Sequence, residues 1–116
     1  MNLNVTRCAA VFFALAPATA SAETVDVKYR GPVDLAPFSC ADTPRSSFIQ
    51  RVCYDQKQSY MLINLRGVYY HYCELPVGTF EALMVAPSMG QFFNQNIKGI
   101  GSDGPYDCRT HKMPAR

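Results

Sequence analysis

Four aromatic and imidazole side chains in a row, at positions 69 to 72, carry the clearest signal for binding chemistry. In a β-strand, Tyr69 and His71 would share one face, while Tyr70 and Tyr72 would share the other. Aromatic rings on an open sheet face can stack bases or sugars, and Arg51 has the strand parity to join Tyr69 and His71. We therefore predict a ligand-binding set that consists of Arg51, Tyr69, Tyr70, His71 and Tyr72.

The side chains on both faces of this predicted strand also have a purely structural interpretation. Tyr70 and Tyr72 can be core residues whose hydroxyls reach the rim, and Tyr69 and His71 can stand on a plain solvated face. Catalysis has little support, because the chain lacks a G-x-S-x-G motif, its two histidines lie in unrelated segments, and no carboxylates are paired for acid–base hydrolysis. We predict no catalytic residue, and a small envelope hydrolase remains as an alternative.

Five cysteines occur in the chain, and Cys8 lies apart from the others in an N-terminal apolar run. The other four, with spacings of 13, 20 and 35 residues, are Cys40, Cys53, Cys73 and Cys108. These spacings contain no Cys-x-x-Cys knuckle of a zinc site. His71 and Cys73 could face one side of a strand, but they are only two ligands. We therefore predict two disulfides, no metal site and no cofactor.

The first 22 residues have the pattern of a secretory signal peptide. Arg7 supplies the positive n-region, a short apolar run ends at Pro17, and small residues precede Glu23. A transmembrane helix needs about 20 apolar residues, roughly twice the length of this run, so we predict no transmembrane anchor. The pattern predicts export to the periplasm or exterior of a bacterium, with cleavage near Ala22–Glu23.

Length, composition and charge restrict the number of domains and the class of partner. The chain has 116 residues, of which 48% are hydrophobic and 17% charged, and its net charge is +2. This length fits one small domain, and the apolar content argues against disorder. The slight charge gives little support to binding of a nucleic-acid backbone. Removal of residues 1–22 would also remove Arg7, which leaves 94 residues with a net charge of +1.

Alternating β-branched and aromatic residues predict three strands, over residues 48–54, 59–66 and 68–74. A polar segment separates the first two strands, and the tight turn Arg66–Gly67 joins the last two. Two consecutive hairpins of this kind make an antiparallel meander. Residues 23–45 are predicted to be an irregular extension with room for one short strand.

Helical spacing of apolar residues follows over residues 77–86. Ser88 then begins a second helix with a capping box, and this helix ends at Gly99. We predict one domain over residues 46–99, with an α+β fold: a three-stranded antiparallel meander followed by two short helices packed on one face. Residues 100–116 are predicted to be a C-terminal tail that a disulfide ties back to the domain.

The predicted meander restricts the disulfide pairing. Cys53 and Cys73 lie on the first and third strands, which the middle strand separates by about 9.5 Å. A disulfide needs Cα atoms within about 7 Å. We therefore predict that Cys53 and Cys73 do not pair with each other. Instead, each would form a disulfide with Cys40 or Cys108 and so hold the N-terminal extension or the C-terminal tail onto the sheet. Such flanks would bury part of the face that carries Tyr69.

An ordered series of residues runs through the predicted domain. Its members are Ser46, Ser47, Ile49, Val52, Tyr54, Asp55, Met61, Ile63, Leu65, the run Gly67–Tyr72 with a Tyr-x-Tyr at Tyr70 and Tyr72, Leu75, Pro76, Leu83, the run Ala86–Gly90, the run Phe92–Asn94, Ile97 and Lys98. In this order and spacing the series resembles the KTSC domain, a small bacterial domain. The resemblance implies the order strand–strand–strand–helix–helix, and RNA binding as a conjectured function of the family.

The chain departs from the usual KTSC domain in its signal peptide, its four cysteines and its extensions on both sides. RNA is scarce outside the cytoplasm, so these departures favour a non-catalytic binding or interaction module, whose partner is an envelope protein or another ligand that the sequence does not name. The alternative is a nucleic-acid-binding domain, which would use Arg51, Arg66, Tyr69, His71 and Lys98.

Overall fold

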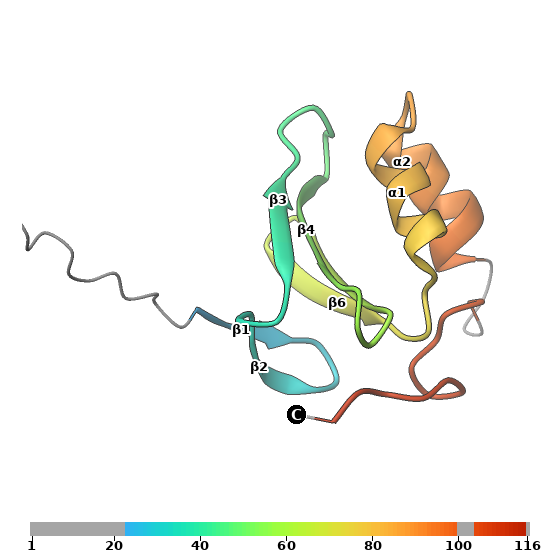
Figure 1. The fold of residues 1–116 in the computed structure, drawn as a ribbon. Helices are drawn as coiled ribbons and strands as arrows, with labels where there is room; N and C mark the ends of the chain where they lie inside the picture. Colours follow the sequence, from blue (N-terminus) through green and yellow to red (C-terminus); the bar gives the residue numbers. More distant parts are fainter. Residues whose placement is uncertain (1–22, 100–103, 116) are drawn as a thin grey trace, which may run out of the picture.

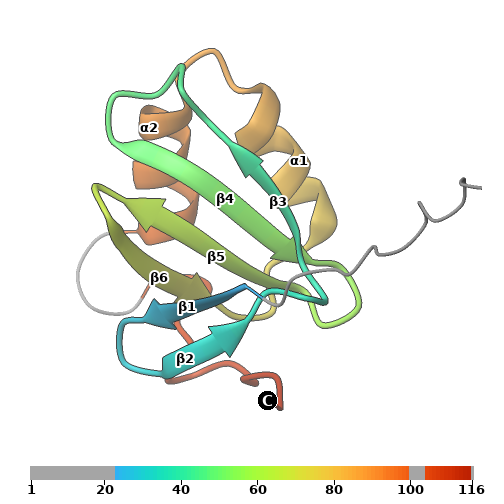
Figure 2. The ribbon, with the colours of Figure 1, turned by 90° about the vertical axis from the view of Figure 1, so that its left-hand side faces the viewer.

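Six strands form one curled sheet in the computed structural model, which describes residues 23–99 and 104–115 (Figure 1). The strands are β1 (Thr24–Val27), β2 (Gly31–Asp34), β3 (Ser39–Asp42), β4 (Ile49–Asp55), β5 (Tyr60–Leu65) and β6 (Val68–Tyr72). Their order across the sheet is β2-β1-β6-β5-β4-β3. All neighbours are antiparallel except β1 and β6, which are parallel, so the sheet is mixed, and it curls into a half-barrel (Figure 2).

The predicted meander is confirmed and forms the centre of this sheet. β5 pairs in antiparallel fashion with β4 on one side and β6 on the other. Arg66 and Gly67 connect β5 to β6 with φ angles of 53° and 95°, and a type I′ hairpin turn requires positive φ at both of its central residues. Asn64 fixes the turn, because its Oδ1 accepts a hydrogen bond from the Gly67 N–H at 2.7 Å.

The N-terminal segment differs from the prediction of an irregular extension. It forms β1, β2 and β3, each four residues long, so the expected three-stranded sheet is in fact six-stranded. Strands this short show little alternation, and Pro32 suggests a break in the middle of β2. The proline is tolerated because β2 is an edge strand, where one backbone N–H can be missing without loss of a ladder bond.

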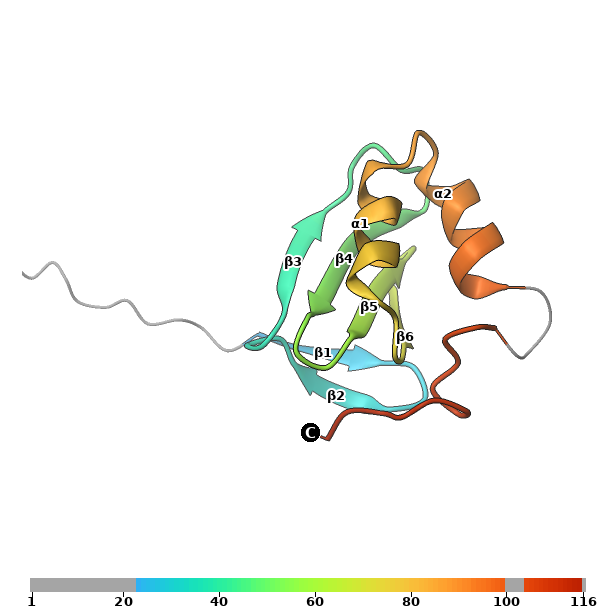
Figure 3. The same ribbon diagram turned by 45° about the vertical axis from the view of Figure 1, so that its right-hand side comes forward.

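Two short helical segments follow the meander and confirm the predicted order. They are α1 (Val77–Val85), α2 (Met89–Phe92) and its π-helical continuation η2 (Phe93–Lys98). Ser88 caps α2, since its hydroxyl oxygen accepts a hydrogen bond from the Gln91 N–H at 3.3 Å. Gly99, with φ of 73°, ends η2. Figure 3 shows α1 and α2 stacked against one side of the sheet.

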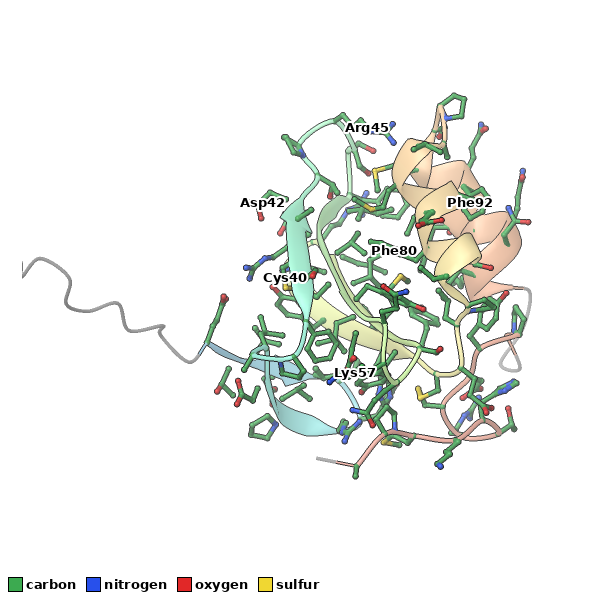
Figure 4. The ribbon with its side chains drawn as sticks, in the orientation of Figure 1. Cys40, Asp42, Arg45, Lys57, Phe80 and Phe92 are labelled. Atoms are coloured by element: carbon green, nitrogen blue, oxygen red, sulfur yellow. A yellow bond between two sulfur atoms is a disulfide. The ribbon has the colours of Figure 1, made fainter. Side chains whose placement is uncertain are left out.

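Both faces of the central strands are buried, which gives the protein two cores. The helix-side core is centred on Ile49, Val52, Tyr54, Met61, Ile63, Leu75, Leu83, Met89, Phe93 and Ile97. The hairpin-side core is centred on Val27, Leu35, Cys53, Tyr60, Leu62, Cys73 and Cys108. Figure 4 shows Phe80 in the space between α1 and the sheet, where its ring stacks on Tyr54 at 4.6 Å between centroids.

Two disulfides, Cys40–Cys53 and Cys73–Cys108, join the flanks to the sheet. They confirm that Cys53 and Cys73 do not pair, and the reason is the predicted one: β5 lies between the strands that lead to them. Cys40 lies directly opposite Cys53 in the β3–β4 register. The tail runs below β6 and the β1–β2 hairpin (Figure 1), and Arg30 holds it there by donating to the Pro114 carbonyl at 2.7 Å.

The predicted signal peptide, residues 1–22, lies outside the described residues, as do residues 100–103 and Arg116. Within the described ranges, no helix combines the length and the apolar character that crossing a bilayer requires.

Candidate ligand-binding site

β6 divides the predicted ligand set between the two faces of the sheet, as the alternation of its side chains implied. Tyr70 and Tyr72 pack against the helix-side core. Tyr69 packs against the hairpin-side core, and His71 contacts Tyr60 on that side. Burial raises the pKa of Tyr72 to about 12, so this hydroxyl keeps its proton at neutral pH and remains a hydrogen-bond donor.

Arg51 and Tyr69 contact each other across β5, but they are already engaged within the fold. The Arg51 guanidinium donates to the Tyr69 hydroxyl at 3.4 Å and pairs with the Glu23 carboxylate at 2.8 Å. The hydrogen bond between Arg51 and Glu23 raises the pKa of Arg51 and lowers that of Glu23. Because the hairpin-side core covers this part of the sheet, Arg51 and Tyr69 do not lie on an open stacking platform.

His71 is half-buried and its ring is fixed by a hydrogen bond. Its Nδ1 lies 2.8 Å from the Tyr60 hydroxyl, and the two rings meet edge to face at 5.8 Å between centroids. Burial is the main cause that lowers the pKa of His71, and the charge of Arg30 adds to it, while Asp107 acts in the opposite direction. The imidazole is therefore neutral at pH 7.

The lowered pKa of His71 predicts a loss of stability in mild acid. Unfolded His71 has its ordinary pKa of 6.5, so between that pH and its lower folded pKa the unfolded chain binds more protons than the folded one. The contribution of neutral His71 to the free energy of unfolding is complete above pH 6.5 and is lost as the pH falls through the folded pKa of His71. We expect His71→Gln to flatten the pH dependence of the urea unfolding midpoint below that pH. An unchanged slope would contradict the assignment.

The His71 ring also lies beside the Cys73–Cys108 disulfide, with ligand-type atoms of all three residues within 4.8 Å of one another. Zinc binds cysteine as the thiolate. Both sulfurs here are consumed by the S–S bond, so in the oxidised protein this cluster offers only one potential ligand, the imidazole.

A hollow of about 570 Å³, which we call the β6 pocket, opens beside β6. It is lined by Lys28, Tyr29, Tyr70, His71, Tyr72, Lys98, Gly104, Asp107, Cys108, Arg109 and Met113. Its volume lies within the range of about 300–1,000 Å³ that is usual for small-molecule sites. Three residues of the predicted ligand set, Tyr70, His71 and Tyr72, are therefore brought together here, and Arg51 and Tyr69 lie elsewhere.

The floor of the β6 pocket is a stretch of sheet edge between two backbone partners. On one side the Tyr69 carbonyl accepts a hydrogen bond from the Lys28 N–H at 2.9 Å, where β1 ends. On the other side the Cys73 N–H donates to the Tyr106 carbonyl of the tail at 2.8 Å. Backbone groups alternate in direction along an antiparallel strand, so the groups of His71, midway between Tyr69 and Cys73, also point away from β5.

His71 consequently presents a backbone donor and a backbone acceptor to the β6 pocket. The part of the chain that the structure describes supplies no backbone partner on this side of His71, because β1 and β6 share a single register pair and the tail begins its pairing at Cys73. Unpaired backbone groups at the base of a pocket are ready to bind a ligand or ordered water.

The charge around the β6 pocket is positive. Of the described residues, Lys28, Lys98 and Arg109 line it, and Asp107 supplies the one carboxylate. Arg109 pairs with Asp107 at 2.6 Å, and its hydrogen bonds lower the pKa of Asp107 to about 2, so this pair is ionised and neutral as a unit. Within residues 23–99 and 104–115, neither Lys28 nor Lys98 forms a salt bridge. Among the described residues, the two lysines therefore give the pocket a net positive charge.

Comparison with protein families identifies the central part of the chain. Residues 45–100 match the family model of the KTSC domain. The chain is a KTSC-domain protein. No match to it was found among curated proteins or among solved structures. The resemblance seen in the sequence is thereby confirmed.

The KTSC domain builds only part of the β6 pocket. Tyr70, His71, Tyr72 and Lys98 belong to the matched range, whereas Lys28 and Tyr29 come from the N-terminal extension and the other lining residues from the tail. The pocket thus exists where both extensions of this KTSC-domain protein meet its domain, and the Cys73–Cys108 disulfide forms part of the wall.

Sequence reasoning missed Lys28 and Tyr29, because it placed them in an irregular extension. A usable signal was present: Val27 and Gly31 bracket a three-residue turn, and a tyrosine between a lysine and an arginine is an unusual choice for a turn. Arg109 and Asp107 flank Cys108, and no local pattern shows that this disulfide would bring them to β6.

Proposed function

We propose that this KTSC-domain protein is an exported, non-catalytic binding module that holds a small molecule in the β6 pocket. The observation that carries the proposal is a convergence in one hollow: the His71 backbone groups and two lysines meet tyrosine rings there, and among the described residues these backbone groups have no backbone partner and these lysines form no salt bridge. Largely apolar pockets with a few convergent polar groups are the usual form of small-molecule sites.

Export is supported by the two disulfides and by the signal-peptide pattern of residues 1–22. Disulfides persist in oxidising compartments such as the periplasm or the cell exterior. The Cys73–Cys108 disulfide holds the tail that lines the β6 pocket, so we expect the complete pocket only in the oxidised protein.

The absence of catalysis is supported by the partners of the two histidines. His71 contacts the Tyr60 hydroxyl, and His111 pairs with Glu74 at 2.9 Å. Nucleophilic catalysis needs a base within hydrogen-bond reach of a serine or cysteine thiol, and neither histidine has such a neighbour among the hydrogen bonds of the described residues. We expect no turnover with a panel of hydrolase substrates; turnover abolished by His71→Gln or His111→Gln would contradict the proposal.

A nucleic-acid-binding function has less support. Arg51 is paired with Glu23, Tyr69 packs in the hairpin-side core, and Arg66 lies in the β5–β6 turn, at the other end of β6 from Tyr72. The residues predicted to contact nucleic acid are therefore not aligned in one groove: His71 and Lys98 line the β6 pocket, whereas Arg51, Arg66 and Tyr69 do not. Salt-sensitive RNA binding in fluorescence anisotropy at low ionic strength would favour this alternative.

A screen of small-molecule fragments by NMR tests the proposal directly. We expect fragments that bind the oxidised, ¹⁵N-labelled protein to shift the amide signals of Lys28, His71 and Asp107 together, because all three line the β6 pocket. Tyr29→Ala should weaken these fragments. Val85→Ala is the matched control, since Val85 is also an exposed hydrophobic residue but lies on α1. Fragments that bind only at other places, or no binding at all, would contradict the proposal.

A further inference from the structure

Tyr29 occupies an unusual position at the rim of the β6 pocket. The Arg30 N–H donates to the Val27 carbonyl at 2.9 Å, which closes a four-residue turn with Lys28 and Tyr29 at its centre. The φ angle of Tyr29 is 71°, in the left-handed region that favours glycine or asparagine at this turn position. A tyrosine side chain here strains the backbone.

The fold gains little from the Tyr29 side chain in return. The residue is 86% exposed, and its described ring contact is with its neighbour Lys28, whose Nζ lies 5.5 Å from the ring centroid. Strained residues persist where function requires them, and a large exposed aromatic ring at a pocket is a common feature of binding sites. Tyr29 therefore has the features of a ligand-stacking residue.

The other groups around the β6 pocket indicate which charge and which hydrogen-bonding groups a ligand needs. Lys28 and Lys98 attract an anionic group. The backbone N–H and C=O of His71 lie side by side on the edge of β6 and match a ring that carries an adjacent carbonyl and N–H. Among the described residues, the edge is open over one residue only, between Tyr69 and Cys73, which is too short for an added peptide strand.

We propose that the β6 pocket takes a small anion whose flat, amide-containing ring stacks on Tyr29 and bonds the His71 backbone, while its phosphate or carboxylate lies between Lys28 and Lys98. This inference rests on the proposed function, because it names the ligand class of the same site.

Four probes separate the parts of this ligand. Uridine monophosphate and orotate join a flat amide ring to a phosphate and a carboxylate, respectively, whereas uridine lacks the charge and inorganic phosphate lacks the ring. We expect at least one of the two anions to bind with a dissociation constant about tenfold lower than those of uridine and phosphate. Which anion binds more tightly distinguishes a phosphate ester from a carboxylate as the source of the charge.

Variants assign the binding to named side chains. Lys28→Gln and Lys98→Gln should each weaken the tighter anion about fivefold at low salt and leave uridine unchanged. Lys57→Gln is the matched control, because Lys57 is an exposed lysine in the β4–β5 turn (Figure 4). Tyr29→Asn should weaken binding about tenfold but raise the melting temperature, because asparagine accepts the left-handed conformation.

The outcomes distinguish this inference from the proposed function. If neutral or cationic fragments bind the β6 pocket and neither anion does, the ligand class is wrong and the proposed function stands. If Tyr29→Asn lowers the melting temperature, Tyr29 has a structural role and the stacking assignment is wrong. If neither the four probes nor any fragment shifts the amides of the β6 pocket, both proposals fall.

Discussion

Replacing Cys73 and Cys108 together by alanine should lower the free energy of unfolding by about 4 kcal/mol. The disulfide joins residues 35 positions apart, and the entropy that a crosslink removes from the unfolded chain increases with the length of the loop it closes. Both cysteines are buried in the hairpin-side core, so the change also removes packing. Urea unfolding of the two proteins, monitored by circular dichroism, measures the difference.

The matched control is the double replacement of Cys40 and Cys53 by alanine. This disulfide spans 13 positions, for which the same relation gives about 3 kcal/mol. The control leaves the tail attached, so only the loss of Cys73–Cys108 should also increase amide exchange in residues 104–115. A loss below about 1 kcal/mol for Cys73–Cys108 would contradict the view that this bond anchors the tail.

Phe93→Ala should destabilise the protein by about 3–5 kcal/mol. Phe93 is 1% exposed and lies where η2 meets the sheet, with its ring edge to face on Tyr72 at 5.7 Å between centroids. Removal of the ring loses buried apolar surface and leaves a cavity in the helix-side core, which closely packed neighbours cannot fill completely. The free energy of unfolding from urea titration measures the effect.

Val85→Ala provides the comparison for Phe93→Ala. Val85 is also apolar and also helical, but it is 79% exposed, so its truncation should change the free energy of unfolding by less than about 0.5 kcal/mol. Equal losses for the two variants would show that α1 and η2 do not pack on the sheet as described.

The sequence revealed those elements whose pattern is long and local. β4, β5 and β6 are runs of five to seven residues rich in β-branched, aromatic and other apolar side chains. The Arg66–Gly67 turn has its own signature, and Ser88 caps a helix by itself. The disulfide constraint also followed from strand geometry, because two residues on the outer strands of a meander are too far apart to pair.

Other parts depend on contacts that no local pattern records. β1, β2 and β3 have four residues each, too few to show alternation, and their stability comes from pairing with β6 and β4. The β6 pocket unites Lys28, Lys98 and Arg109, which come from three separate segments of the chain, and Arg109 follows Cys108, which the disulfide joins to Cys73 at the end of β6. The aromatic run around His71 was recognised from the sequence. The feature that matters most for the proposed site, however, is the backbone N–H and C=O of His71, which the sequence does not show to face a pocket.

Hydrogen exchange at the His71 amide tests the central claim, that β6 has an open backbone position at the floor of the β6 pocket. The amides of Tyr70 and Tyr72 point toward β5 and pair with it, whereas that of His71 faces the pocket. In the oxidised protein without ligand, we expect His71 to exchange on the order of 100-fold faster than Tyr70 and Tyr72. Equal protection of the three amides would show that His71 already has a backbone partner, and the proposed ligand site would be closed.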